Sequence, residues 1–119
     1  METIEVRHTA FQGTEDTVAL VEVKENLSLV QKLEYAFRWT NNTSGSWSKK
    51  VISIEHEGVD YPNRDYNEFV TVVTPLYKDE DGQEYGHRST SVGDQLVIND
   101  QVYVVANVGF ENLKGERVQ

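Results

Sequence analysis

The residues best suited to chemistry lie between His87 and Asp94, where an arginine is followed by hydroxyl side chains and an aspartate. A guanidinium group, hydroxyls and backbone N–H groups could together hold an anion or the carboxylate of a partner. The same residue types also form ordinary turns, in which Gly93 supplies a positive φ and Arg88 pairs with Asp94. We favour the turn. The candidate binding residues of this segment are Arg88, Ser89, Ser91 and Asp94.

A second set of candidate binding residues surrounds the end of an expected helix and consists of Trp39, Asn41, Asn42 and Trp47. Two tryptophans offer large amphipathic side chains of the kind that dominate binding hot spots. In the alternative interpretation, which we favour, Trp47 folds back and covers the open side of the helix. Asn41 and Asn42 suit a left-handed exit from the helix, so we expect the helix to stop there.

The charge of the chain is strongly acidic, with 20 acidic and 11 basic residues and a net charge of −9. Direct binding of nucleic acid would require a basic surface, so this balance argues against it. One candidate acidic surface consists of Asp79, Glu80, Asp81 and Glu84. Such a surface could attract a basic partner by long-range steering, including the nucleic-acid groove of another protein. In the alternative that we favour, it only keeps a small protein soluble.

Patterns typical of catalysis or metal binding are missing from the sequence. The three histidines, His8, His56 and His87, lack metal-type spacing, and no serine lies in a nucleophile-elbow motif. The chain contains no cysteine, which excludes disulfides and thiol chemistry. We therefore expect no catalytic residue, no metal and no cofactor, and we predict that the protein is not an enzyme.

The clearest secondary-structure prediction next to these residues is a β-hairpin. Residues 96–98 and 102–105 are apolar strand segments joined by Asn99 and Asp100, which tolerate positive φ and suit a two-residue turn. Both segments are apolar at nearly every position, which suits strands covered on two faces or a small closed barrel. We expect Leu96, Val102 and Val104 to fill the sheet interior.

The segment after the hairpin should rejoin the same core. Gly109 permits a bend, after which Phe110 and Leu113 can return apolar side chains to the interior. A chain of 119 residues forms one domain, which we place at residues 1–113, with residues 114–119 as a frayed tail. No signal-peptide pattern and no stretch of about 18 apolar residues is present, so we expect a cytoplasmic location and no membrane contact.

The remaining elements follow from periodicity and turn residues. Alternating apolar residues predict strands at 3–8, 18–23, 51–55 and 69–77, with a polar turn around Gly13, a polar loop at 58–67 and a hairpin turn at 79–82. Ser28 and Gln31 form a capping-box pattern ahead of helically spaced apolar residues, which predicts a helix over 28–40. These elements predict an α+β fold: a curved, mostly antiparallel sheet of five to seven strands, with the helix packed on it and inserted after the second strand.

The segment 88–94 also carries a resemblance. Its Arg-Ser-Thr-Ser-Val-Gly-Asp run, followed by a hairpin and Val108-Gly109-Phe110, resembles a C-terminal module of small uncharacterised proteins from phages, plasmids and actinobacterial or haloarchaeal genomes. Residues 36–42 and 45–47 resemble the helix end and Trp-containing loop that precede this module, and the matching pieces cover roughly a third of the chain. The long acidic stretch between Trp47 and Phe69 departs from the pattern. The resemblance implies a phage or mobile-element origin and supplies no activity to transfer.

Two functional hypotheses remain open. In the first, the protein is a non-enzymatic accessory protein of a phage or mobile element that acts in the host cytoplasm by binding a host protein, with inhibition of a defence or nucleic-acid enzyme as one outcome. Its mark would be acidic side chains beside exposed Trp or Tyr. In the second, the loop 88–94 and the Asn41/Asn42 region form a small-ligand or anion site, whose mark would be a concave pocket at which both segments converge.

Overall fold

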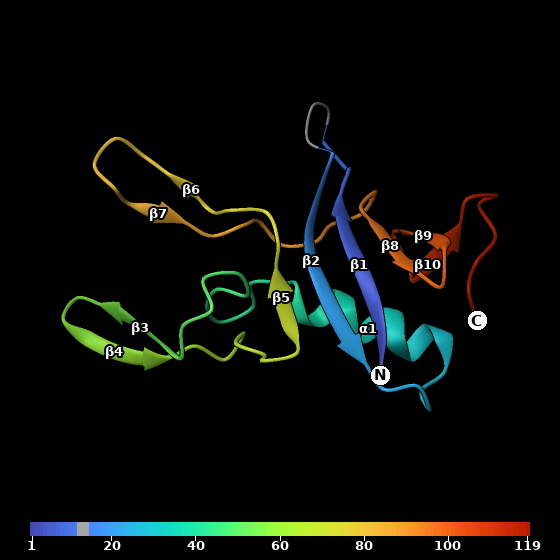
Figure 1. Ribbon diagram of the computed structural model, residues 1–119, viewed down its shortest axis with the longest axis horizontal. Coiled ribbons are helices and arrows are strands. Elements are labelled where there is room, and N and C mark those ends of the chain that lie inside the picture. Colours follow the sequence, from blue (N-terminus) through green and yellow to red (C-terminus); the bar gives the residue numbers. More distant parts are fainter. Residues whose placement is uncertain (12–14) are drawn as a thin grey trace.

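The computed structural model describes residues 1–11 and 15–119, and within them the chain forms one helix and ten strands (Figure 1). The helix is α1 (Leu29–Trp39). The strands are β1 (Glu2–His8), β2 (Asp16–Val23), β3 (Ser53–His56), β4 (Val59–Pro62), β5 (Val70–Val72), β6 (Tyr77–Lys78), β7 (Glu84–Tyr85), β8 (Gln95–Ile98), β9 (Gln101–Val105) and β10 (Phe110–Asn112). The polar turn expected around Gly13 lies outside the described residues.

Six of these strands form one antiparallel sheet in the order β10-β9-β8-β1-β2-β5, and α1 lies across one face of it (Figure 1). The prediction of an α+β fold, with a sheet of five to seven strands and one helix after the second strand, is confirmed. The sheet ends at β10 and β5 and does not close, so the small-barrel alternative for the hairpin is wrong.

The two central strands follow the predicted alternation. Ile4 and Val6 of β1 are fully buried and lie opposite Val21 and Ala19 of β2, which are also fully buried. Burying a side chain of the size of valine or isoleucine stabilises a fold by about 1.5 to 3 kcal/mol. The intervening residues of β1 point to the face that α1 leaves uncovered. This period of two predicted which side chains of β1 form the core.

The start of α1 also matches its prediction. The Ser28 hydroxyl accepts a hydrogen bond from the backbone N–H of Gln31, and the Gln31 side chain accepts one from the backbone N–H of Ser28. This capping box satisfies two donors that the first turn would otherwise leave unpaired. Leu33 and Ala36 then turn toward the sheet and are fully buried.

The end of α1 differs from the prediction. Neither Asn41 nor Asn42 has a positive φ, so the expected left-handed exit is wrong. Side chains take over instead: the Thr40 hydroxyl donates to the Ala36 carbonyl at 2.8 Å, and the Asn41 amide donates to the Phe37 carbonyl. These bonds, together with the bond of 3.3 Å from the Thr40 backbone N–H to the Phe37 carbonyl, satisfy carbonyls of the last turn, so a glycine-like conformation is unnecessary.

The predicted hairpin is present as β8 and β9, with φ values of 51° at Asn99 and 64° at Asp100. Its interior differs in part from the prediction. Leu96 is fully buried as expected, but Val102 and Val104 are only half-buried, because they pair with Val97 and Gln95 on the opposite face of the sheet. The other buried side chains of the hairpin are Ile98 and Val105.

The chain after β9 returns to the core only at Phe110. Gly109 has a φ of 71°, and Phe110 packs edge-on against Phe37 of α1 at a ring-centroid distance of 6.2 Å. Leu113, which was expected in the core, is 69% exposed. Residues 114–119, expected to be frayed, fold back along β10, where the Val118 N–H donates to the Phe110 carbonyl at 2.8 Å.

Two short hairpins, β3–β4 and β6–β7, project from the same end of the molecule, away from the six-stranded sheet (Figure 1). We call them the two arms. The β6–β7 arm contains the predicted turn at residues 79–82. The β3–β4 arm corrects two predictions: its first strand begins at Ser53 rather than at residue 51, and its second strand lies within 58–67, which was expected to be a loop. The strand predicted at 69–77 is divided, with Pro75 between β5 and β6.

Candidate functional site

Most of the residues singled out in the sequence surround a group of buried polar side chains, which we call the polar interior. It lies where the end of α1, the end of β1 and the loops 41–50, 63–65 and 88–94 meet. Its members are the polar residues buried within the described parts of the chain: His8, Thr40, Ser46, Ser48, Asn63, Asp65, Thr90 and Asp94. Each buried side-chain N or O atom of the described residues has a hydrogen-bond partner.

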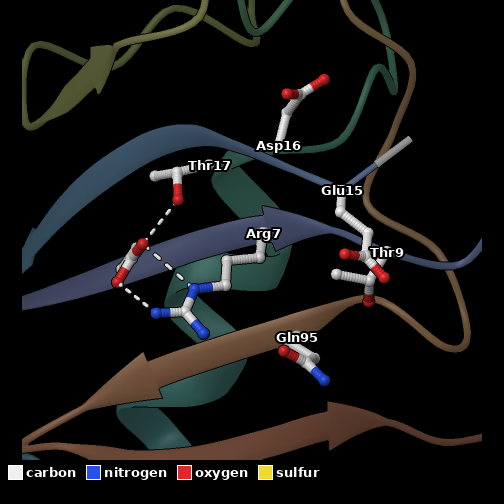
Figure 2. A pocket seen from close by; sticks show the side chains of 7 residues that line it. Arg7, Thr9, Glu15, Asp16, Thr17 and Gln95 are labelled. Atoms are coloured by element: carbon white, nitrogen blue, oxygen red, sulfur yellow. Dashed lines mark hydrogen bonds and ion pairs between the residues drawn. The ribbon is translucent and has the colours of Figure 1, made fainter. Parts of the chain in front are cut away.

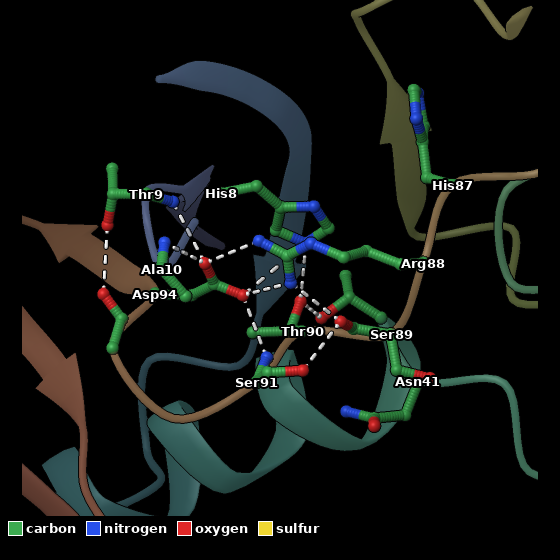
Figure 3. A network of polar contacts seen from close by, with 12 residues as sticks. His8, Thr9, Ala10, Asn41, His87, Arg88, Ser89, Thr90, Ser91 and Asp94 are labelled. Atoms are coloured by element: carbon green, nitrogen blue, oxygen red, sulfur yellow. Dashed lines mark hydrogen bonds and ion pairs between the residues drawn. The ribbon is translucent and has the colours of Figure 1, made fainter. Parts of the chain in front are cut away.

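Asp94 is the centre of the largest network in the polar interior (Figure 3). The Arg88 guanidinium donates to both of its carboxylate oxygens, at 2.6 and 2.8 Å. Three backbone N–H groups also donate to it: those of Thr9 at 2.8 Å, Ala10 at 2.9 Å and Ser91 at 2.7 Å. The carboxylate of Asp94 therefore joins the end of β1 to the loop 88–94.

Electrostatics keep this carboxylate ionised in spite of its burial. Burial would raise the pKa of Asp94, but the Arg88 guanidinium and the backbone N–H groups of Ser91 and Ala10 outweigh it and hold the pKa below its usual range. The pair between Arg88 and Asp94 that the turn interpretation expected is present. Because the Arg88 charge is engaged by Asp94, an incoming anion would have to compete with a buried carboxylate for it.

The loop 88–94 and the Asn41/Asn42 region do converge. The backbone N–H of Asn42 donates to the Ser89 hydroxyl at 2.9 Å, and the Asn42 side-chain amide donates to the His87 carbonyl at 3.1 Å. The Ser91 hydroxyl donates to the Ser89 carbonyl. The two segments therefore meet, as the ligand hypothesis required. However, their polar atoms form hydrogen bonds with each other.

His8 is a member of the polar interior that sequence reasoning did not single out. The Thr40 hydroxyl donates to a carbonyl, so it accepts from Thr90, whose only proton is then used. Thr90 must therefore accept the hydrogen bond of 3.0 Å from Nε2–H of His8. Burial lowers the pKa of His8 to about 4, although Asp94 at 4.0 Å favours the charged form. The neutral imidazole therefore has a structural role as a hydrogen-bond donor. Its burial could have been predicted from the alternation of β1, which places His8 on the same face as Ile4 and Val6.

Asp65 and Asn63 organise the loop 41–50 in the same manner. The Asp65 carboxylate is fully buried and accepts from the Thr43 hydroxyl at 2.6 Å and from the backbone N–H groups of Thr43 and Ser44 at 2.9 Å. Burial would raise the pKa of Asp65, but these donors and the Arg38 guanidinium hold it below the usual range. Asn63 bonds the backbone of Ser46 in both directions. No sequence pattern distinguished these two residues.

The tryptophans among the candidates occupy different environments. Trp47 is completely buried, and its indole N–H donates to the Arg88 carbonyl at 2.9 Å, as the favoured interpretation of a folded-back side chain requires. Its ring lies near the rings of His8 and His87. Trp39 is half-buried on α1, with the Arg38 guanidinium 4.2 Å from its ring centroid. Trp47 is thus a core residue, which removes it from the candidate binding residues.

A polar hollow of about 380 Å³ opens on the sheet face that α1 leaves uncovered (Figure 2). It is lined by Glu5, Arg7, Thr9, Glu15, Asp16, Thr17 and Gln95. The Arg7 guanidinium donates twice to Glu5, which also accepts from the Thr17 hydroxyl, and the Arg7 bonds hold the pKa of Glu5 below its usual range. In the described residues, no three His, Asp or Glu side chains are arranged to hold a metal ion.

The candidate acidic residues all belong to the β6–β7 arm. Asp79 has a local role, since its carboxylate accepts from the backbone N–H groups of Asp81 and Gln83 and from the Tyr85 hydroxyl. Tyr77 and Tyr85 lie directly opposite each other on this arm, with exposed fractions of 66% and 50%. The predicted acidic segment therefore lies beside two exposed tyrosines.

The β3–β4 arm has one largely apolar face and one acidic face. Its register places Ile54 opposite Tyr61 and His56 opposite Val59, so one face is largely apolar. Glu55 lies opposite Asp60 on the other face. Tyr61 and Val59 are both exposed.

No α-helix in the described chain is long and apolar enough to cross a membrane. A scan against protein-family models, a search of curated proteins and a search of solved structures each found no match to this chain. The resemblance to the phage and plasmid module therefore stays a prediction.

Proposed function

We propose that the protein is a non-enzymatic accessory protein of a phage or mobile element, and that it acts in the host cytoplasm by binding a host protein through the two arms. The observation that carries this proposal is that each arm exposes a largely apolar or aromatic face and also carries acidic side chains, in the turn of the β6–β7 arm and on the other face of the β3–β4 arm. This combination is the mark that the first hypothesis requires, because aromatic anchors supply affinity and charge supplies steering.

The energetics of the arms support a binding role. A two-stranded hairpin that packs on nothing is marginally stable in water, and each arm lies outside the six-stranded sheet. Exposed apolar area on such elements is costly for solubility and is typical of surfaces that a partner covers. A partner that packs against the arms would stabilise both hairpins and bury their tyrosines.

The contacts of the polar interior weaken the alternative, a ligand site at the loop 88–94. Arg88, Ser89, Asp94 and Asn42 make hydrogen bonds that hold loops together. A ligand at the loop 88–94 would have to break several of these bonds, so the small-ligand or anion module has less support than the protein-binding role. The expected consequence of host binding is inhibition of a defence or nucleic-acid enzyme, whose basic groove the acidic arms would approach.

The proposal can be tested by capture from a host lysate with the immobilised full chain at low and high salt. We expect one host protein to be retained at low salt and weakly at high salt, and to be lost when Val59→Ser, Tyr61→Ser, Tyr77→Ser and Tyr85→Ser are combined. The matched control is Val108→Ser with Leu113→Ser, which removes exposed apolar side chains away from the arms. Retention of nothing by the native chain, or equal retention by the arm variant, would overturn the proposal.

A further inference from the structure

The exposed rings of Tyr77 and Tyr85 form a continuous aromatic surface on the β6–β7 arm, which we call the tyrosine platform. Their centroids are 5.9 Å apart and their planes are inclined by 31°. The Tyr85 hydroxyl donates to Asp79 at 3.1 Å, and the same carboxylate caps the turn through the N–H groups of Asp81 and Gln83. The platform is therefore held in place before any partner arrives, which lowers the entropy cost of binding.

Other aromatic rings in this chain already carry a cation. Arg38 lies over Trp39 at 4.2 Å, and Lys50 lies over Tyr66 at 4.7 Å. Arg88 lies over Phe11 at 4.6 Å. Such contacts follow from the negative electrostatic potential of a ring face.

The tyrosine platform differs from those three rings. Among the residues that the structure describes, no Lys or Arg lies over Tyr77 or Tyr85. Lys78 lies opposite Glu84 in the register of the arm, and both residues face away from the tyrosines, because side chains alternate along a strand. The platform is thus an open aromatic surface with the chemistry to accept a cation from another molecule.

The charges around the platform favour a positively charged partner. Glu80 and Asp81 lie in the turn that follows the platform, whereas Glu84 and the single base of this arm, Lys78, lie opposite each other on its other face. The phosphates of nucleic acid would be repelled here, whereas a cationic side chain would gain both the ring faces and the carboxylates. A planar guanidinium stacks on aromatic rings and pairs with carboxylates better than an ammonium group does.

We propose that the tyrosine platform is a docking site for an arginine-rich segment of a partner protein. This inference rests on the proposed function, since the segment would belong to the host protein that the arms bind. It goes further in assigning the contact to one arm and in naming the chemistry of the partner.

The test is a titration of the full-length ¹⁵N-labelled chain with a 12-residue peptide of alternating arginine and serine, followed by NMR. The expected result is that shifts concentrate at residues 77–85 and that the matched peptide of alternating glutamate and serine produces none. Tyr77→Ser with Tyr85→Ser should weaken binding by about tenfold, while Tyr77→Phe with Tyr85→Phe, which keeps both rings, should retain most of it.

Charge is tested separately from aromatic contact. Glu80→Gln, Asp81→Asn and Glu84→Gln together should also weaken binding of the arginine peptide by about tenfold. The matched control is Glu22→Gln, Glu34→Gln and Glu111→Gln, which changes the net charge by the same amount on β2, α1 and β10 and should change the affinity less than about twofold. Equal weakening by the two triple variants would show unspecific attraction and overturn the inference.

The other outcomes are equally decisive. Unchanged binding by the serine variant, or shifts centred outside residues 77–85, would overturn the inference. If the lysate experiment still retains a host protein through the arms while the arginine peptide fails to bind, the proposed function stands and this inference falls. If the peptide binds the platform but combined serine substitutions on the arms leave lysate capture unchanged, the proposed function falls.

Discussion

The polar interior and the two arms use similar residue types for opposite purposes. Both contain aspartates, hydroxyl side chains and aromatic rings near short turns. In the polar interior, the carboxylate of Asp94 is fully buried and accepts hydrogen bonds from four residues. On the β6–β7 arm, Tyr77 and Tyr85 lie in solvent. The residues that look most functional in the sequence are thus engaged within the fold, whereas most side chains of the arms are exposed.

The largest expected effect comes from removing Asp94. Asp94→Ala would leave the Arg88 guanidinium and three backbone N–H groups without their acceptor, and should lower the free energy of unfolding by about 3 to 5 kcal/mol. Asp79→Ala removes an aspartate that also accepts backbone bonds, but in an exposed turn, and should cost about 1 kcal/mol. Urea unfolding of both variants measures the difference. Equal losses would mean that the two regions do not differ in the way described.

A pH effect of about 3 kcal/mol should come from His8. Its pKa is lowered to about 4 in the fold but is about 6.5 in the unfolded chain. Between these values the unfolded state binds a proton that the folded state excludes, so stability falls as the pH falls from about 6.5 to about 4. The charged groups that act on His8 are Asp94, Arg88, Asp16 and, when protonated, His87.

The control for this prediction is His8→Gln, which keeps a side-chain donor for Thr90 and removes the titration. Urea unfolding at a series of pH values should show a loss in the native chain that this variant lacks. Asp65 and Asp94 contribute in a different window, because their lowered pKa values remove stabilisation only below about pH 4. Parallel pH profiles of the native chain and the variant would contradict the prediction.

Two glycines, one beside the polar interior and one on an arm, allow a further test of this difference. A Cβ atom at Gly45 would lie 2.1 Å from the side-chain oxygen of Asn63, so Gly45→Ala should displace Asn63 from its bonds and cost about 2 to 3 kcal/mol. At Gly58 of the β3–β4 arm, a Cβ meets nothing within 4 Å, and only its φ of 78° opposes alanine. Gly58→Ala should cost about 1 kcal/mol. Thermal unfolding would refute the comparison if Gly58→Ala were the more damaging change.

The smallest effect on stability is expected for the tyrosine platform. Tyr77→Ser with Tyr85→Ser removes one exposed cross-strand pair and should change the free energy of unfolding by less than about 1 kcal/mol. The matched aromatic pair inside the fold is Phe37 with Phe110, and Phe110→Ala should cost about 3 kcal/mol or more. A large loss from the tyrosine substitutions would show that the arm supports the fold and is not free for binding.

Local patterns predicted the secondary structure well where a single short-range cause dominates. The capping box at Ser28 and the turn at Asn99 and Asp100 depend on residues within a few positions of each other, and both are present. The pair between Arg88 and Asp94 is local in the same sense. Errors arise where distant partners intervene, as after the end of α1, where the backbone N–H of Asn42 donates to the Ser89 hydroxyl 47 residues away.

Burial was harder to predict than strand position. Val102 and Val104 were assigned to the interior because of their hydrophobicity, but the register of β9 against β8 places them on the uncovered face. Leu113 was assigned to the core for the same reason and is exposed. Hydrophobicity alone does not specify which face of a strand is covered, because a shift of one residue exchanges the two faces.

Local sequence patterns and composition were enough to predict the α+β class, the capped helix, the positions of most strands and the acidic charge. These depend on periodicity, turn chemistry and composition, which act over short distances along the chain. Tertiary contacts, in contrast, determine the burial of His8, Asp65 and Asp94, and they confirm that Trp47 folds back into the core. They also decide that the acidic segment stands on an arm beside exposed tyrosines. The burial and the contacts of a polar or aromatic side chain depend on residues tens of positions away in the chain. Local sequence patterns therefore do not predict them.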